Sequence, residues 1–178
     1  MKKQKVFDGV LVRQFQSGNK NALATLVKRW HKTFCEKAYW IVKDADVAKD
    51  IAQDSWSIII NKINHLKTPE SFGIWALRIV YTKSLDWVKA NKKLQNIIVE
   101  NQRNQDAFHV EKDNNEPLKV ALLKTIKMLP DNQQIVIRLF YLQEYSLKEI
   151  SSILQISEGT VKSRLFHARE KLKQNLKT

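Results

Sequence analysis

The sequence has a single cysteine, Cys35, and only 4 glycines and 3 prolines among 178 residues. One cysteine excludes an internal disulfide, which fits a reducing compartment. So few helix-breaking residues predict an all-α fold. No apolar stretch is long enough to span a bilayer, and the basic amino-terminal segment lacks the apolar run of a secretory signal. We therefore expect a soluble cytoplasmic protein without membrane insertion.

Acidic residues are also scarce, because 31 Lys and Arg face 18 Asp and Glu, a formal net charge of +13. This balance favours an anionic partner, either nucleic acid or, as the weaker alternative, an acidic membrane surface. The sequence shows no nucleophile–base pair, no phosphate-binding glycine loop and no pair of catalytic carboxylates, so we predict neither an enzyme nor a cofactor. His31 and Cys35 share a helical face, but no second ligand pair accompanies them, and no metal site is predicted.

The charge is unevenly distributed along the chain. Residues 1–93 carry a net +10, residues 94–116 a net −3 and residues 117–178 a net +6. The acidic middle stretch is rich in Asn and Gln and has no sustained apolar period, so it cannot offset its chain entropy by burial. We predict two small helical domains, 1–94 and 117–178, joined by a flexible acidic linker, 95–116.

The first domain reads as helices throughout. Asn19 or Asn21 can cap a long helix, and the turn at 44–46 can cap a second helix that carries apolar residues to Ile63. Pro69 then interrupts the chain before a third helix that begins near Phe72.

The segment from Tyr145 to Leu172 predicts a helix-turn-helix with a basic second helix. Ser157 can cap that second helix by accepting a backbone N–H of its first turn. A helix that is apolar behind and basic in front suits the major groove of DNA. The alternative is an ordinary helical hairpin whose charges are merely solvated. The expected buried stripe consists of Val161, Leu165, Ala168 and Leu172.

Three segments, in this order and around an acidic linker, resemble bacterial sigma factors of the extracytoplasmic-function group in the sigma-70 family. DVAKDIAQDSW (Asp46–Trp56) resembles the family's segment in region two that docks on the RNA polymerase clamp. FGIWALRIVYTKSLDWVK (Phe72–Lys89) resembles the helix that opens and reads the minus-ten element. Leu129–Leu172 resembles region four, which reads the minus-thirty-five element. The resemblance covers nearly the whole chain and implies a region-two bundle followed by a region-four helix-turn-helix.

The resemblance implies that core RNA polymerase binds Asp50, Gln53 and Asp54. The two carboxylates are four residues apart and share a helical face, which suits a basic partner surface. The alternative is local charge balance against Lys43 and Lys49.

The third helix and the loop before it combine cations with planar groups, as single-stranded DNA requires for its backbone and its unstacked bases. Trp75 continues the apolar stripe, so we assign it to the core. Within this segment we expect Tyr81, Thr82 and the loop from His65 to Ser71 to contact bases. The resulting candidate residues for minus-ten contacts are His65, Lys67, Ser71, Arg78, Tyr81, Thr82, Lys89, Lys92 and Lys93.

For the last helix, the resemblance places a polar and basic set of side chains toward DNA. Lys162 and Arg164 can neutralise phosphates, and Ser163 and His167 can donate to base edges. The first-turn amides can receive a phosphate oxygen. The full candidate set is Glu158, Gly159, Thr160, Lys162, Ser163, Arg164 and His167.

Four residues depart from the family pattern. Gln155 stands at the turn where the family often has glycine, and a left-handed Gln there would cost about 1 kcal/mol. Ser151 replaces a usual alanine, Thr82 a common asparagine and His167 a common arginine. These departures leave the family resemblance standing and bear on promoter preference.

The resulting hypothesis is a sigma factor that binds core RNA polymerase at its clamp and flap, recognises both promoter elements and performs no covalent chemistry. An anti-sigma factor is the regulatory partner that the resemblance implies. One alternative is a stand-alone helix-turn-helix regulator, which leaves the aromatic third helix unexplained. Another is a degenerate sigma-like interaction module, which Gln155 and His167 keep open.

Overall fold

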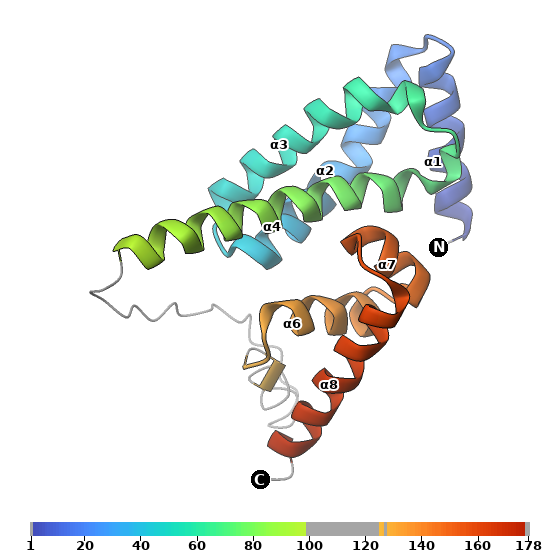
Figure 1. Ribbon diagram of the computed structural model, residues 1–178. Coiled ribbons are helices and arrows are strands. Elements are labelled where there is room, and N and C mark those ends of the chain that lie inside the picture. The colour runs from blue at the N-terminus through green and yellow to red at the C-terminus, as the bar shows by residue number, and fades with distance from the viewer. Residues whose placement is uncertain (1, 99–124, 127, 177–178) are drawn as a thin grey trace, which may run out of the picture. The chain divides into compact units, whose positions relative to one another are not determined.

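The computed structural model describes residues 2–98, 125–126 and 128–176, with side chains for 6–91, 125–126 and 128–175. The chain divides into two compact units, Met1–Gln102 and Arg103–Thr178, called here the first and the second unit. Every regular element in the described residues is a helix or a helical turn (Figure 1). The predicted all-α fold is therefore confirmed.

The first unit is a helical bundle in which side-chain caps set the starts of two helices. The carboxamide oxygen of Asn19 accepts the N–H of Asn21 at 3.0 Å, and the carboxylate of Asp44 accepts the N–H groups of Asp46 and Val47 at 2.9 and 3.0 Å. The bundle consists of α1 (Lys2–Gln16), α2 (Lys20–Val42), α3 (Ala45–Lys62) and α4 (Phe72–Ile98), with the 3-10 turns η1 (Ile63–His65) and η2 (Pro69–Ser71) between α3 and α4.

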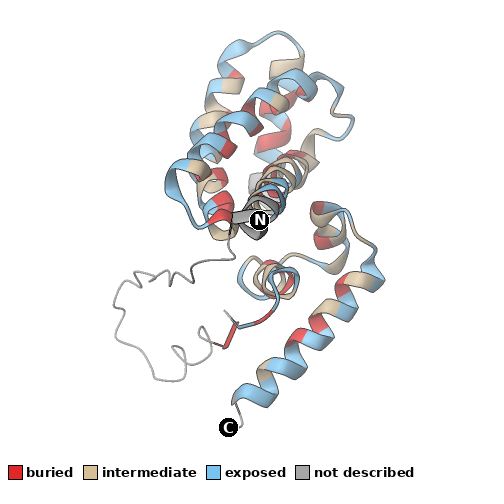
Figure 2. Cartoon of the chain, turned by 60° about the vertical axis from the view of Figure 1, so that its left-hand side comes forward, coloured by how far each residue is buried: buried red, intermediate tan, exposed pale blue. Residues whose placement is uncertain are grey.

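An aromatic cluster fills the centre of this bundle. Phe34 and Phe72 are fully buried, and the Trp30 ring lies 5.8 Å from the first and 6.0 Å from the second, between centroids. The Trp56 ring lies 4.9 Å from Phe34. Gly73 leaves room for Trp30, because a Cβ at position 73 would lie 2.7 Å from the indole ring. Figure 2 shows how the buried residues line the inner faces of the helices.

The first unit differs from the sequence prediction in two helices: one helix was not predicted, and another is longer than predicted. The sequence did not predict α1, whose buried residues Leu11 and Val12 are accompanied by exposed apolar neighbours that blur its pattern. The helix α4 continues to Ile98, four residues (95–98) into the segment predicted as linker. The remainder of that segment, 99–116, lies outside the described residues.

The second unit packs α6 and α7 on α8. Ser146 starts α7 with a capping box, because its hydroxyl accepts the N–H of Glu149 at 3.2 Å while the Glu149 carboxylate accepts the N–H of Ser146 at 3.0 Å. Within the segment 118–128, only residues 125, 126 and 128 are described. The elements are α6 (Asp131–Ile137), the π-helical η3 (Arg138–Leu142), α7 (Leu147–Leu154) and α8 (Glu158–Leu176).

The core of the second unit is formed by apolar side chains from all of its helices. The predicted stripe of α8 is confirmed at Val161, Leu165 and Ala168, which are buried, whereas Leu172 is half-buried. Ile150 and Ile153 of α7 are fully buried. The outward faces of α8 are thereby left for polar and basic side chains.

Candidate nucleic-acid interface

The start of α8 is fixed by Ser157, as the sequence predicted. The Ser157 hydroxyl oxygen accepts the N–H of Thr160 at 3.0 Å and lies 2.9 Å from the Thr160 hydroxyl. The next two residues, Glu158 and Gly159, are exposed and belong to the first turn, where backbone N–H groups lack helical partners. A Cβ on Gly159 would meet only the Ser157 hydroxyl, at 3.7 Å. This glycine therefore leaves open space beside the helix start.

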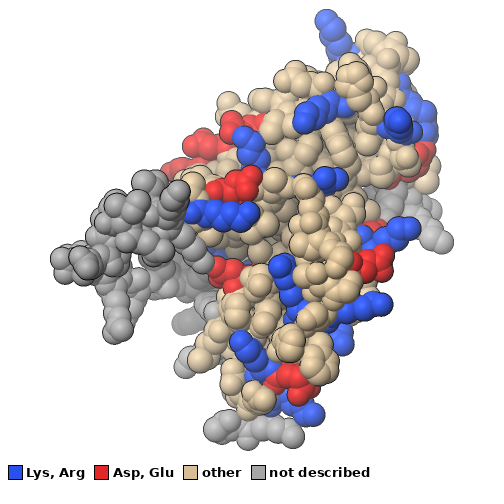
Figure 3. Space-filling model, viewed as in Figure 1, with Lys and Arg blue, Asp and Glu red and all other residues tan. Residues whose placement is uncertain are grey.

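The predicted contact residues of α8 lie off the core. Lys162, Ser163 and His167 are exposed, and Thr160 and Arg164 are half-buried at the flank of the buried stripe. In Figure 3, Lys and Arg side chains lie along the visible face of the second unit.

Phe166 is a residue of this face that the sequence interpretation missed. It is 60% exposed, and its ring packs edge-on against His167 at 5.5 Å. Because Ser163 and Phe166 are three residues apart, they share a helical face. An apolar residue outside the buried stripe was the available signal. Arg169, by contrast, places its guanidinium 5.6 Å from the Phe140 ring and 5.5 Å from the Tyr141 ring, so it is held against η3.

The turn between α7 and α8 contains a left-handed residue. It is Gln155, the position where the sequence analysis considered a left-handed conformation. Gln155 has φ 54° and ψ 43°, and its N–H donates to the carbonyl of Ser151. The N–H of Ile156 also donates to the Ser151 carbonyl, at 3.2 Å. The Ser151 hydroxyl closes the turn from the other side by donating to the Ile156 carbonyl at 2.6 Å. Two of the departures from the family pattern, Ser151 and Gln155, therefore meet in one turn.

In the first unit, the loop before α4 presents His65 and Lys67 to solvent. Ser71 is half-buried, and its N–H and hydroxyl both donate to the Thr68 carbonyl, at 2.9 and 2.6 Å. Its side chain is thus already engaged in closing the turn η2.

Three predicted residues of α4 share one outward face. Arg78 and Lys89 are exposed and Thr82 is half-buried, and helical geometry aligns positions 78, 82 and 89. Lys89 lies 3.7 Å from the carboxylate of Asp86. The side chains of the predicted Lys92 and Lys93 lie outside the described residues.

Tyr81 is a correction to the sequence interpretation. Its side chain is 3% exposed, so the prediction that it contacts an unstacked base is wrong for this structure. The reason is its register, because Tyr81 lies four residues after the buried Leu77 and three residues before the buried Ser84. Trp75, assigned to the core, is half-buried and packs 6.1 Å from Phe72.

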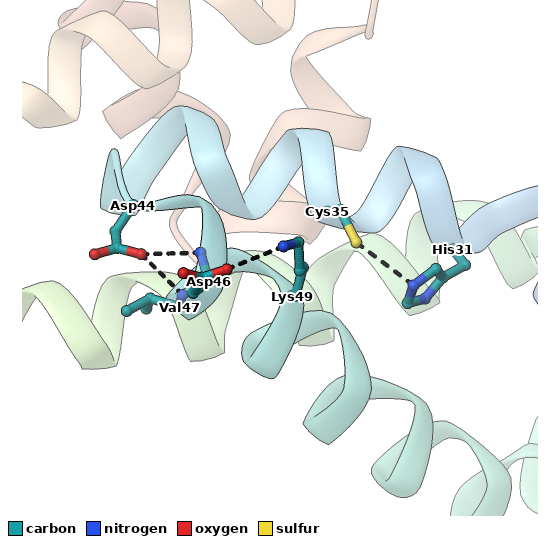
Figure 4. A network of polar contacts seen from close by, with 6 residues as sticks. All are labelled: His31, Cys35, Asp44, Asp46, Val47 and Lys49. Atoms are coloured by element: carbon teal, nitrogen blue, oxygen red, sulfur yellow. Dashed lines mark hydrogen bonds and ion pairs between the residues drawn. The ribbon is translucent and has the colours of Figure 1, made fainter.

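The acidic face of α3 is exposed at Asp50, Gln53 and Asp54. Figure 4 shows that the neighbouring Lys49 turns to Asp46, at 2.9 Å. The hydrogen bond and charge of Asp46 raise the pKa of Lys49, with a smaller contribution from Asp50.

Asp54 has a cation of its own nearby. The Lys83 amine lies 3.5 Å from its carboxylate, and the side chains are 40% (Lys83) and 67% (Asp54) exposed. The alternative interpretation expected Lys43 and Lys49 to balance the charge of the acidic face. For Asp54, the neighbouring cation is instead Lys83 of α4. Such exposed pairs contribute little to stability and leave the carboxylate accessible.

His31 and Cys35 do meet on α2, with 3.7 Å between Nε2 and Sγ (Figure 4). Burial raises the pKa of the Cys35 thiol. Within the described residues, no group of three or more potential ligands is placed to hold a metal ion. The described part of the chain also contains no helix with the length and apolar character needed to cross a membrane.

Comparison with known proteins identifies the family. Residues 119–172 match the family described as Sigma-70, region 4. The chain is 31% identical over 143 residues to the ECF RNA polymerase sigma factor SigM of Bacillus subtilis (strain 168), covering 75% of this chain and 82% of SigM. It is 26% identical over 182 residues to SigW of the same organism, covering 93% and 95%.

The fold agrees with a solved sigma factor. The structure of RpoE from Bartonella quintana, determined in complex with the anti-sigma factor NepR, matches with a TM-score of 0.68 at 19% identity, covering 87% of this chain and 96% of that one. From its sequence relatives and its two helical units, the chain belongs to the extracytoplasmic-function (ECF) sigma factors of the sigma-70 family, which direct RNA polymerase to promoters.

Proposed function

We propose that this sigma factor uses three surfaces at a promoter. The outward face of α8 reads the minus-thirty-five element, the loop 63–71 and the outward face of α4 engage the minus-ten element, and the acidic face of α3 docks on the polymerase clamp. The observation that carries the proposal is the arrangement of α8. Its start is capped by Ser157, and its exposed polar and basic face lies opposite the buried Val161, Leu165 and Ala168. The proposed domains are 1–94 and 117–178, joined by the acidic segment 95–116.

On α8, different side chains take different parts of the DNA. Lys162 and Arg164 neutralise phosphates, while Ser163 and His167 donate to base edges in the major groove. Phe166 adds an apolar contact that suits a thymine methyl group. The amides of Glu158 and Gly159 receive a phosphate oxygen at the start of the helix, where the helix dipole favours an anion.

At the minus-ten element, the proposed contacts come from two neighbouring segments of the first unit. His65 and Lys67 reach out from the loop, and Ser71 lies at its end. Arg78, Thr82 and Lys89 extend the surface along α4. Cations on this surface neutralise the backbone of the separated strand, as single-strand binding requires. Lys92 and Lys93 belong to the same proposal through their sequence positions alone.

Core polymerase is proposed to meet the protein at two places. Asp50, Gln53 and Asp54 give α3 an exposed acidic face, which complements a basic partner surface and raises association rates. The flap is proposed to contact the helix-turn-helix unit. By analogy with the sigma factor solved with NepR, an anti-sigma factor is proposed to cover one of these faces. We place the protein in the cytoplasm, where it catalyses no reaction of its own.

The salt dependence of DNA binding tests the assignment of α8. Arg164→Ala is expected to weaken binding and to lower the slope of log affinity against log salt by about 0.9, the value for one phosphate. Arg169→Ala is the matched control, because Arg169 lies on the same helix but is held against the rings of η3. An unchanged slope for Arg164→Ala would exclude a phosphate contact there.

Polymerase docking is tested by affinity for the core enzyme. The double variant Asp50→Ala, Asp54→Ala is expected to bind core polymerase more weakly while keeping its helical content. Asp86→Ala, an exposed carboxylate of α4, controls for the loss of surface charge. Equal affinity of the double variant and the wild type would refute the docking role of α3.

A further inference from the structure

The loop between α3 and α4 is tied at one end to α1. The Gln16 amide nitrogen donates to the carbonyl of Ile63 at 2.8 Å and to the carbonyl of Leu66 at 3.2 Å. These carbonyls lie at the two ends of the turn η1, which is itself closed by the Leu66 N–H donating to Ile63 at 3.1 Å. One half-buried side chain thus fixes both ends of the turn.

A second tie holds the other end of the same loop. Arg13, one turn before Gln16 on α1, forms an ion pair with Glu70 in η2. The hydrogen bond from Arg13 lowers the pKa of the Glu70 carboxyl, so the pair stays charged at neutral pH. Gly9 permits the close approach, because a Cβ there would lie 3.2 Å from the backbone nitrogen of Glu70. In Figure 1 the connection from α3 to α4 runs beside α1.

Between the two ties, the loop turns its side chains outward. His65, Lys67 and Thr68 are exposed, whereas Leu66 is half-buried. The contacts from α1 therefore fix the backbone of the loop without covering its tip. A loop that is ordered before binding loses less conformational entropy when it meets a ligand.

We propose that Gln16 and Arg13 are positioning residues that hold the loop 63–71 in the conformation that engages the single-stranded minus-ten DNA. This inference rests on the proposed role of the loop. Neither residue touches DNA in the proposal, because both act through the backbone and Glu70. Loss of the two Gln16 hydrogen bonds is expected to weaken capture of the single strand about tenfold, which is about 1.4 kcal/mol and lies within the net energy of two hydrogen bonds.

The test uses the complete holoenzyme of core polymerase and this protein. Two probes are taken from one promoter found by run-off transcription, namely the single-stranded non-template minus-ten oligonucleotide and the minus-thirty-five duplex. Gln16→Leu removes the donors at similar size and is expected to bind the single strand about tenfold more weakly, with unchanged duplex binding. Gln14→Leu, an exposed neighbour on α1, is the matched control and is expected to behave like the wild type.

A charge exchange keeps the test decisive if Gln16→Leu fails to fold. Arg13→Glu is expected to weaken single-strand binding, and the added exchange Glu70→Arg is expected to restore it. Failure of Arg13→Glu to weaken binding, or of the exchange to restore it, would overturn the positioning role.

The double variant His65→Ala, Lys67→Ala tests the DNA-binding role of the loop separately from the positioning role of α1. If it weakens single-strand binding while the α1 variants do not, the positioning role fails and the loop assignment stands. If it has no effect, the loop assignment fails.

Discussion

The two segments proposed to meet DNA are held in shape by contacts of different range. The loop 63–71 depends on Gln16 and Arg13, which lie 47 to 57 residues away in sequence from their partners. The turn before α8 depends on Ser151 and Ser157, whose partners lie within 5 residues. The first site therefore requires the assembled bundle, whereas the second carries its own supports.

Glycine is used differently in the two units as well. In the first unit, Gly73 gives the Trp30 ring its place in the core. In the second unit, Glu144 and Gln155 adopt the left-handed conformation with φ 54°, although neither is glycine. The first unit thus gains packing from a small residue. Left-handed strain occurs twice in the described part of the second unit and once in that of the first, at Lys43.

The largest expected difference comes from adding one methyl group to each unit. Gly73→Ala should destabilise the first unit by about 1–2 kcal/mol, because displacement of the packed Trp30 ring outweighs the better helix propensity of alanine. Gly159→Ala should not destabilise the second unit, since its new Cβ meets only the Ser157 hydroxyl at 3.7 Å. Urea unfolding followed by tryptophan fluorescence reports on the first unit alone, because all 5 tryptophans lie between Trp30 and Trp87. Hydrogen exchange reports on the second, and equal effects in both would contradict the comparison.

Alkaline pH should separate the units by a similar amount. Burial raises the pKa of Tyr145 to about 12 from its usual 10.0. The unfolded chain then releases this proton first, so the second unit keeps its full stability below pH 10 and loses on the order of 2 kcal/mol as pH rises toward 12. Burial lowers the pKa of Lys37 in the first unit. The unfolded chain keeps this proton to higher pH, so through Lys37 the stability of the first unit rises with pH. Tyr145→Phe should abolish the alkaline loss in urea titrations of the second unit, and persistence of the loss would contradict this assignment.

Ser151→Ala tests the local support of the turn. It removes the donor to the Ile156 carbonyl and should destabilise the second unit by about 0.5–1 kcal/mol, after allowance for the helix propensity of alanine. Ser152→Ala is the matched control, since Ser152 is exposed on the same helix. Thermal unfolding should show a lower midpoint for position 151 only; equal midpoints for the two variants would remove the hydroxyl from the argument.

The smallest expected effect is a gain. Gln155→Gly should stabilise the second unit by about 0.5 kcal/mol, because relief of the left-handed strain exceeds the extra entropy of glycine in the unfolded chain. Lys43→Gly, at φ 61° in the first unit, should act in the same direction. Destabilisation by either change in a urea titration would show that the side chain itself supports its turn.

This contrast in range explains what sequence could predict. The cap at Ser157 and the stripe through Val161 and Leu165 follow from spacings of three to four residues, so the helix-turn-helix could be predicted in detail. Phe166 was not predicted as part of the exposed face, because an apolar residue outside the buried stripe carries no local sequence pattern that indicates its function.

The first unit was harder to predict for the same reason. Burial of Tyr81 depends on what the far side of α4 packs against, and the hold of α1 on the loop joins residues about 50 positions apart. The helix α1 itself mixes buried Leu11 with exposed Val6 and Phe7, which weakens its amphipathic pattern. Its role becomes visible only when the bundle is assembled.

Run-off transcription tests directly whether this protein directs RNA polymerase to promoters. Purified core RNA polymerase from the source bacterium, with and without this protein, is given a library of genomic fragments. We expect discrete new transcripts whose upstream regions share two spaced motifs, one for each unit. Absence of protein-dependent transcripts, despite demonstrated binding to core polymerase, would contradict it and favour a sigma-like protein that only sequesters a partner.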